Sequence, residues 1–157
     1  MDSTTTTSLQ ALGITSSLLL SGIYAGSSLL TMPILYRLPS ATSLDIWTEF
    51  FYRGFVTVVP LAVSGTFGLA TVAYLMPSKR KTLATGSVLV ISTLAWTSLI
   101  MKGGIDRLLL LNESTAELQM AGSGEVLALL KTWTWQNMVR SVLAGAGGIV
   151  GIYGLVQ

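Results

Sequence analysis

The chain has 157 residues, of which 51% are hydrophobic and only 10% are charged. A soluble domain carries about a quarter charged residues, so this chain has too few charges to coat a soluble globule of its size. The composition therefore predicts one domain, residues 1–157, that lies in a lipid bilayer. No basic stretch is interleaved with aromatic residues, and this excludes nucleic-acid binding.

Two residue types are missing from the chain, since it contains neither cysteine nor histidine. Without cysteine there can be no disulfide, iron–sulfur ligation or thiolate catalysis. Without histidine there can be no His-ligated haem, zinc hydrolase site or Ser-His-Asp triad. We therefore predict no metal site. Any chemistry must use carboxylates, Tyr, Lys, Arg, amides, hydroxyls or the reactivity of the substrate itself.

Charged residues divide the chain into four long uncharged runs. A bilayer core of about 30 Å needs about 20 helical residues. We predict an all-α integral membrane four-helix bundle, with spans near residues 9–35, 54–76, 83–102 and 134–156. The polar, Thr-rich residues 1–8 lack the basic region of a signal peptide and are expected to form a disordered tail.

Small residues recur every four positions within the predicted spans, as in Gly13, Ser17 and Ser21, with Gly22 and Gly26 on a neighbouring stripe. In lipid such stripes allow helix backbones to approach closely. We favour close packing of the bundle over a substrate groove as their role. The same faces could also join copies of the chain in a homo-oligomer.

The two longer connections between spans are expected to carry interfacial helices. Residues 45–53 place aromatic side chains on one face and Glu49 and Arg53 at i, i+4. We favour an aromatic belt that anchors the second span over a functional role for this segment. Residues 103–131 form a long connector, with an amphipathic helix near 124–135. It also contains Asn112, in an Asn-Glu-Ser glycosylation pattern.

The distribution of basic residues predicts the orientation in the membrane. Lys79, Arg80 and Lys81 lie together in a short connection, which favours cytosolic placement of that connection and of both termini. We expect a multi-pass protein of the endoplasmic reticulum or a related endomembrane.

The sharpest local signal opens the fourth span, where Trp133, Asn137 and Arg140 fall on one helical face. An arginine within a membrane span is costly unless it is paired or hydrated, and it marks a functional site by default. The alternative is an arginine that snorkels to the interface beside tryptophan anchors. We favour a polar pocket to which Asp106, Glu49 and Glu113 contribute from the same side of the membrane.

This pattern resembles the anthrone oxygenase family of small four-helix membrane proteins, several of them from fungal polyketide pathways. The resemblance rests on Trp133-x-x-x-Asn137-x-x-Arg140 and on Gly22-Ile-Tyr24-Ala-Gly26. Met32-Pro33, Leu38-Pro39, Trp47, Tyr52, Gly54 and Pro60 also agree. One departure is that Asp106 occupies a position where the family usually has Asn.

The resemblance implies a membrane-bound, cofactor-independent oxygenase that converts an anthrone-type polyketide to an anthraquinone, with O2 as co-substrate. It implies that Arg140 and Asn137 donate to a developing oxyanion, and that Asp106 or Glu49 removes the proton. It also implies a planar apolar substrate, held by the following side chains: Trp133, Trp47, Tyr52, Tyr24 and Arg53.

Two other functions remain open at this point. The same scaffold could carry a cyclase or isomerase that acts on an apolar intermediate, because fold does not fix function. A non-catalytic membrane scaffold or a carrier of small apolar molecules is the third candidate. Ion or proton transport is disfavoured, since the first three predicted spans contain no internal charge.

Overall fold

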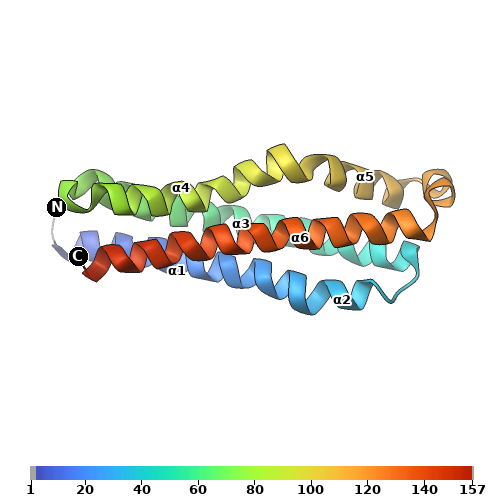
Figure 1. The fold of residues 1–157 in the computed structure, drawn as a ribbon, viewed down its shortest axis with the longest axis horizontal. Helices are drawn as coiled ribbons and strands as arrows, with labels where there is room; N and C mark the ends of the chain where they lie inside the picture. The colour runs from blue at the N-terminus through green and yellow to red at the C-terminus, as the bar shows by residue number, and fades with distance from the viewer. Residues whose placement is uncertain (1–2, 157) are drawn as a thin grey trace.

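The computed structural model describes residues 3–156 as an elongated bundle of helices without strands (Figure 1). Both chain ends lie at one end of the bundle, and α5 lies near the other (Figure 1). The elements are α1 (Ser3–Gly26), the π-helical turn η1 (Ser27–Thr31), α2 (Met32–Leu35), α3 (Ser40–Leu75), the 3-10 turn η2 (Pro77–Lys79), α4 (Arg80–Trp96), the π-helical turn η3 (Thr97–Met101), α5 (Lys102–Glu113) and α6 (Thr115–Val156).

The predicted four-helix membrane bundle is confirmed. Four continuous helical stretches are long and apolar enough to cross a membrane: Thr4–Leu35, Ser40–Leu75, Pro77–Glu113 and Gly124–Val156. The closest packing joins α1 to α3, α3 to α4, α4 to α6 and α6 back to α1, so each long helix lies mainly between two neighbours. This is a multi-pass membrane protein.

The spans are longer than the predicted ones, because the expected interfacial helices are continuous with them. α3 has 36 residues and includes residues 45–53 without a break. Pro39, in an extended conformation, starts this helix, and nothing in residues 40–53 interrupts it. The helix also passes through Pro60, which cannot donate the usual hydrogen bond to the carbonyl of Val56.

The connector 103–131 contains helices, as expected, and is almost wholly helical: α5 runs to Glu113, and α6 starts at Thr115 and is interrupted at Gly122, with φ of 69°. Gly122 takes up a left-handed conformation at this bend, which only glycine adopts cheaply. The expectation of a disordered tail over residues 1–8 was wrong for its described part, because α1 is helical from Ser3 onward. Residues 1–2 lie outside the described part.

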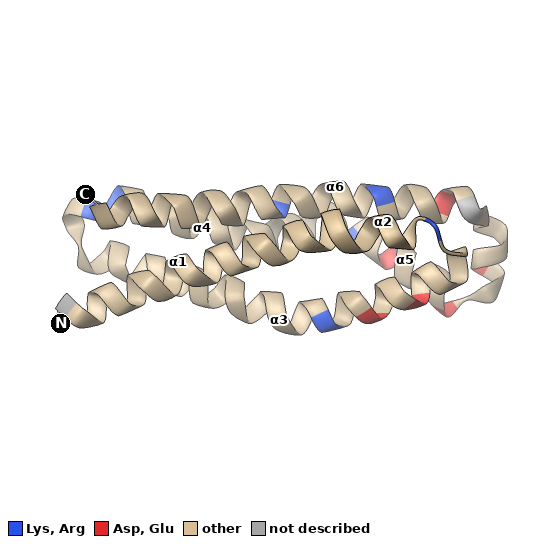
Figure 2. Ribbon diagram, turned by 90° about the horizontal axis from the view of Figure 1, so that it is seen from below, with Lys and Arg blue, Asp and Glu red and all other residues tan. Residues whose placement is uncertain are grey.

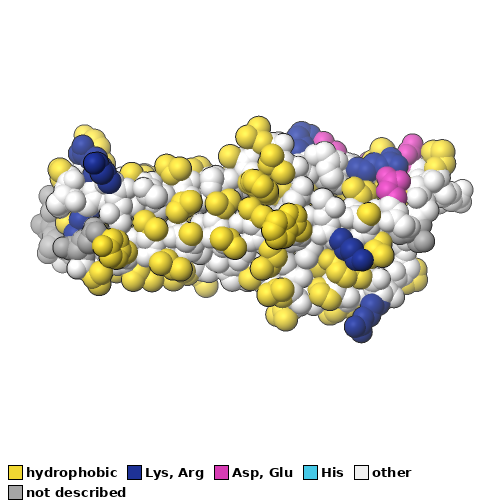
Figure 3. Space-filling view, viewed as in Figure 1, with side chains coloured by type: hydrophobic (Ala, Val, Ile, Leu, Met, Phe, Trp, Pro, Cys, Tyr) yellow, Lys and Arg dark blue, Asp and Glu magenta, His cyan; other side chains and the backbone are white. Residues whose placement is uncertain are grey.

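Charged residues lie at the end of the bundle that holds the termini and over the opposite half, with an uncharged stretch between them (Figure 2). The space-filling view shows hydrophobic side chains over the middle of the visible face, with basic and acidic groups toward the ends (Figure 3). A 36-residue helix is about 54 Å long at 1.5 Å per residue, whereas the hydrocarbon core is about 30 Å thick. The bundle therefore extends beyond the hydrocarbon core.

The interior contains two clusters of buried apolar side chains. The terminal cluster, near the chain ends, contains Leu20, Tyr24, Val58, Ala62, Leu69, Val72, Leu83, Val90 and Ala144. The distal cluster contains Met32, Leu35, Leu44, Trp47, Met101, Leu108, Leu111, Leu130 and Trp133. The distal cluster is the richer in tryptophan, and Leu108 and Leu111 of α5 belong to it, whereas Leu110 is exposed.

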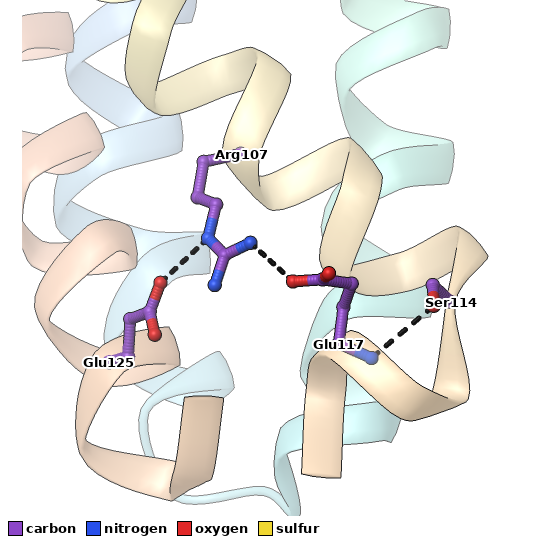
Figure 4. A network of polar contacts seen from close by, with 4 residues as sticks. All are labelled: Arg107, Ser114, Glu117 and Glu125. Atoms are coloured by element: carbon purple, nitrogen blue, oxygen red, sulfur yellow. Dashed lines mark hydrogen bonds and ion pairs between the residues drawn. The ribbon is translucent and has the colours of Figure 1, made fainter. Parts of the chain in front are cut away.

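A polar clasp holds the far end of the bundle together. Arg107 of α5 donates to Glu117 at 2.8 Å and to Glu125 at 2.7 Å, on either side of the Gly122 bend (Figure 4). The hydroxyl of Ser114 accepts from the backbone N–H of Glu117 at 3.3 Å. One guanidinium thus ties both arms of the turn between α5 and α6.

Small residues bring the membrane helices into close contact within the chain. A Cβ atom added to Gly68 would lie 2.6 Å from the carbonyl oxygen of Leu9 and 2.8 Å from the backbone nitrogen of Gly13. Gly86 and Gly147 meet in the same manner between α4 and α6. By contrast, a Cβ at Gly22 or Gly26 would meet nothing within 4 Å. Oligomerisation through the stripe containing Gly22 and Gly26 stays a prediction.

We expect Gly68→Ala to destabilise the bundle by about 1–3 kcal/mol, because the added methyl group meets backbone atoms that cannot turn aside. Thermal unfolding in detergent micelles, followed by circular dichroism, measures the effect. Gly22→Ala is the matched control and should keep or slightly raise the melting temperature, since its methyl group meets open space. Equal melting temperatures for the two variants would contradict the close packing of α1 on α3.

Candidate functional site

A cavity of about 540 Å³ lies among α1, α3, α4 with η3, and α6. It lies where the two hydrophobic clusters meet, because Tyr24 and Val58 of the terminal cluster and Trp133 of the distal cluster all line it. Its walls are mainly apolar and aromatic. The lining side chains are those of Ile23, Tyr24, Ser27, Phe50, Phe51, Arg53, Phe55, Thr57, Val58, Val59, Leu94, Thr97, Ser98, Trp133, Asn137 and Arg140, together with Gly54.

Two π-helical turns border this cavity. Ser27 belongs to η1 and Thr97 and Ser98 to η3, and all three line the cavity. A π-helical turn adds a residue to the helical turn and rotates the side chains that follow, and such turns are frequent at functional sites. Two long helices therefore change their local winding at the cavity.

Arg140 of α6 is buried in the cavity wall, with 6% of its surface exposed. Its Nη2 donates to the hydroxyl of Tyr24 at 2.5 Å, and its Nη1 donates to Oδ1 of Asn137 at 3.2 Å. Nη1 also lies 3.9 Å from the sulfur of Met101. The guanidinium carbon is 3.9 Å from the centroid of the Tyr24 ring, within cation–π range. Nε has no hydrogen-bond partner within the described chain.

Asn137 holds this arginine in place. Its Nδ2 donates to the backbone carbonyl of Tyr24 at 3.0 Å and to the hydroxyl of Ser28 at 3.1 Å. Both amide hydrogens are thereby engaged, and the amide oxygen is turned toward Arg140. The expectation that Asn137 donates to a substrate oxyanion is not supported by this arrangement, in which it acts on Arg140 instead.

Five of the predicted site residues line the cavity: Tyr24, Arg53, Trp133, Asn137 and Arg140. Two others do not. Trp47 is fully buried behind the wall, stacked on Phe51 with ring centroids 5.3 Å apart and edge-on to Trp133 at 6.0 Å. Tyr52 is 53% exposed on the outer side of α3, where it contacts Phe51. Trp47 therefore supports the aromatic wall, and Tyr52 lies outside it.

The predicted carboxylates are not gathered around Arg140. Asp106 pairs with Lys102 at 2.5 Å, with 56% of its side chain exposed. Glu49 pairs with Arg53 at 2.5 Å and is likewise exposed, as is Glu113. Of residues 3–156, no Asp or Glu lines the cavity. Each carboxylate pairs with a cation four residues away on the exposed surface of its own helix. It therefore avoids the large desolvation free energy of entering the cavity.

Several other site residues were not predicted from the sequence. Ser28 and Met101 contact Asn137 and Arg140 from the π-helical turns, and Phe50 and Phe51 supply much of the aromatic wall. The one available signal was the pair of small polar dipeptides, Ser27-Ser28 and Thr97-Ser98, within apolar spans. In lipid such hydroxyls need a partner, and here they face the cavity or α6.

The remaining sequence expectations concern groups away from the cavity. Asn112, the glycosylation candidate, lies half-buried in the last turn of α5 and not in an irregular loop. Within the described part of the chain, no three His, Cys, Asp or Glu side chains are grouped to hold a metal ion.

We expect Tyr24→Phe to lower the stability of the bundle by about 1–3 kcal/mol, because it leaves a buried guanidinium donor without its acceptor. The melting temperature in detergent measures this loss. Tyr74→Phe, at a tyrosine that is 79% exposed, is the matched control and should change it little. An unchanged melting temperature for Tyr24→Phe would show that its hydroxyl contributes nothing to holding Arg140.

Comparison with known proteins bears on the chain from α3 to α6. The family model described as anthrone oxygenase matches residues 47–150, a range that includes Trp133, Asn137 and Arg140. No curated protein and no solved structure gives a significant match. The family match covers about two thirds of the sequence and most of the cavity wall. The chain therefore belongs to the anthrone oxygenase family.

Proposed function

We propose that this protein is a membrane-bound oxygenase that converts an anthrone-type polyketide to an anthraquinone, using O2 without a metal or flavin. The observation that carries the proposal is a largely apolar, aromatic cavity of about 540 Å³ with one buried guanidinium in its wall. Family membership supports an oxygenase role. The particular reaction and the absence of a cofactor are our inference.

The dimensions and lining of the cavity suit a flat polycyclic ligand. Small-molecule sites are typically about 300–1,000 Å³, mostly apolar, with few polar groups that fix orientation. Phe50, Phe51 and Trp133 offer ring faces and edges on one side, and Arg140 offers a hydrogen-bond donor. A tricyclic ring system with an oxygen on its central ring would match this combination.

An apolar substrate would reach the cavity from the surface of α3 and η3. Phe55, Thr57 and Ser98 line the cavity and are also exposed on the outside of the bundle. This stretch belongs to the membrane-length helices, so a compound dissolved in the bilayer could enter there directly. We place the enzyme in the endoplasmic reticulum or a related endomembrane.

The reaction needs no external reductant. The benzylic CH2 of an anthrone loses a proton, and its electron pair delocalises onto the ring oxygen as an enolate. One electron passes to O2, and the resulting radical pair forms a C–O bond to give a peroxide. Loss of the second benzylic proton with cleavage of the O–O bond leaves C=O and water. The CH2 and O2 are thus converted to C=O and H2O.

The residues divide this work between them. Arg140 donates to the oxygen on which negative charge develops, and Asn137 positions Arg140. Of the two carboxylates considered as the base, Glu49 is held by a cavity-lining side chain, Arg53, whereas Asp106 pairs with Lys102. The proposal therefore assigns proton acceptance to Glu49 and no role to Asp106.

We expect Arg140→Gln to lower kcat/KM for an anthrone by about 10²–10³-fold, because a donor aimed at the developing oxyanion is lost. Quinone formation by the protein in lipid nanodiscs is followed by absorbance. Asp106→Asn is the matched control at an exposed charge and should retain full activity. Quinone formation under strict anaerobiosis would contradict oxygenation and favour a different pathway enzyme. No turnover of any anthrone with O2 present would favour the non-catalytic alternative.

We expect Glu49→Gln to slow proton removal while leaving substrate binding nearly unchanged. The readout is a lower kcat with a larger kinetic isotope effect for a substrate deuterated at the benzylic carbon. Full kcat in Glu49→Gln would assign the proton to solvent and remove Glu49 from the mechanism.

A further inference from the structure

The two charged side chains of the described chain that line the cavity differ in whether they have a counter-ion. Arg53 and Arg140 are the charged side chains that line it within residues 3–156. Arg53 has its counter-charge in Glu49, at 2.5 Å on the exposed surface of α3. Arg140 has none, since no carboxylate of the described chain forms an ion pair with it.

The partners of Arg140 are all neutral. They are the Tyr24 hydroxyl and ring, the Asn137 amide oxygen and the Met101 sulfur. These groups orient the guanidinium and satisfy part of its hydrogen-bonding capacity, but they cannot cancel its charge. Arginine keeps its proton in proteins, and a buried charge without a counter-ion is expensive. The positive charge of Arg140 is therefore not compensated by any side chain of residues 3–156 that lines the cavity.

No neighbouring element supplies that charge. Of the groups facing Arg140 across the cavity, α1 contributes Tyr24, and α3 contributes the already paired Arg53. α4 and η3 contribute the uncharged Leu94, Thr97 and Ser98. A negatively charged ligand would complete the site.

From this arrangement we infer that the cavity binds a flat aromatic ligand as its phenolate or enolate anion in preference to the neutral form, with the charged oxygen against Arg140. The inference rests on the proposed function for the carbon skeleton of the ligand, and on the geometry of Arg140 for its charge. Such a site raises the acidity of the bound ligand. An exposed carboxylate such as Glu49 then suffices as proton acceptor.

The test uses two anthraquinones that differ by one methyl group. 2-Hydroxyanthraquinone ionises to a phenolate with a distinct visible absorption band, and its methyl ether cannot ionise. Each is titrated with the protein in nanodiscs over a range of pH, with protein-free nanodiscs as the blank. The bound hydroxyl compound should keep its phenolate band to lower pH than in the blank, and its affinity should rise with pH while that of the ether stays constant.

Variants assign the effect to Arg140. At a pH where the probe is ionised, Arg140→Gln should weaken its binding by about 30-fold or more and leave the ether within about threefold. Arg37→Gln, at an exposed arginine in the α2–α3 turn, is the control and should bind as the unmodified protein does. Arg140→Lys, which keeps the charge, should retain part of the preference for the anion.

Each outcome decides the inference. An ionisation curve for the probe on the unmodified protein that coincides with the blank, or shifts to higher pH, overturns it, even if Arg140→Gln does not fold. So does an unchanged anion preference in folded Arg140→Gln. Anion binding without oxidation of any anthrone would refute the proposed reaction but not this site. Oxidation without anion preference would refute this inference alone.

Discussion

The burial of one guanidinium within an apolar bundle is the constraint around which the rest of the site is arranged. Arginine keeps its charge in proteins, and the side chain of Arg140 is almost fully covered. Its neutral partners belong to three helical stretches, namely α1, η3 and α6 itself. Holding the charge therefore requires these elements to meet at one level of the bundle.

The seam between α1 and α6 provides that meeting place. Ser21 and Ser141 exchange hydrogen bonds with each other's backbone carbonyls at 2.8 and 2.9 Å. On the distal side of Arg140, Ser28 donates to the carbonyl of Thr134 at 3.2 Å, and Tyr36 bonds to the Thr134 hydroxyl at 2.5 Å. In lipid, where the hydrophobic effect does not drive helices together, such contacts and small residues fix their register. The register set by these serines places Tyr24 beside Arg140.

The sequence predicted the features that depend on composition and local spacing. The four spans follow from the uncharged runs, and the shared face of Trp133, Asn137 and Arg140 follows from helical periodicity. What it could not predict is which partner each polar side chain takes. From the sequence, Asp106 and Glu49 could pair either with Arg140 or with a cation one helical turn away. In the structure each forms an ion pair with the cation on its own helix, Lys102 or Arg53. The dipeptides Ser27-Ser28 and Thr97-Ser98 mark the two π-helical turns only as polar positions within apolar spans, and this does not specify the contacts of Ser28 and Met101.

Among residues 3–156 no carboxylate lines the cavity, and this has a chemical consequence. A carboxylate paired with Arg140 would neutralise the guanidinium and leave the cavity with no electrostatic preference among ligands. Neutral partners orient the guanidinium of Arg140 without cancelling its charge, so its electrostatic potential still acts on a ligand in the cavity. A preorganised charge of this kind has its largest effect in a dry site with apolar walls, because no solvent rearranges to screen it. Under the proposed function, the aromatic wall of Trp133, Phe50 and Phe51 limits the polar surface around the ligand, while Arg140, which has no ion-pair partner within residues 3–156, stabilises negative charge on it.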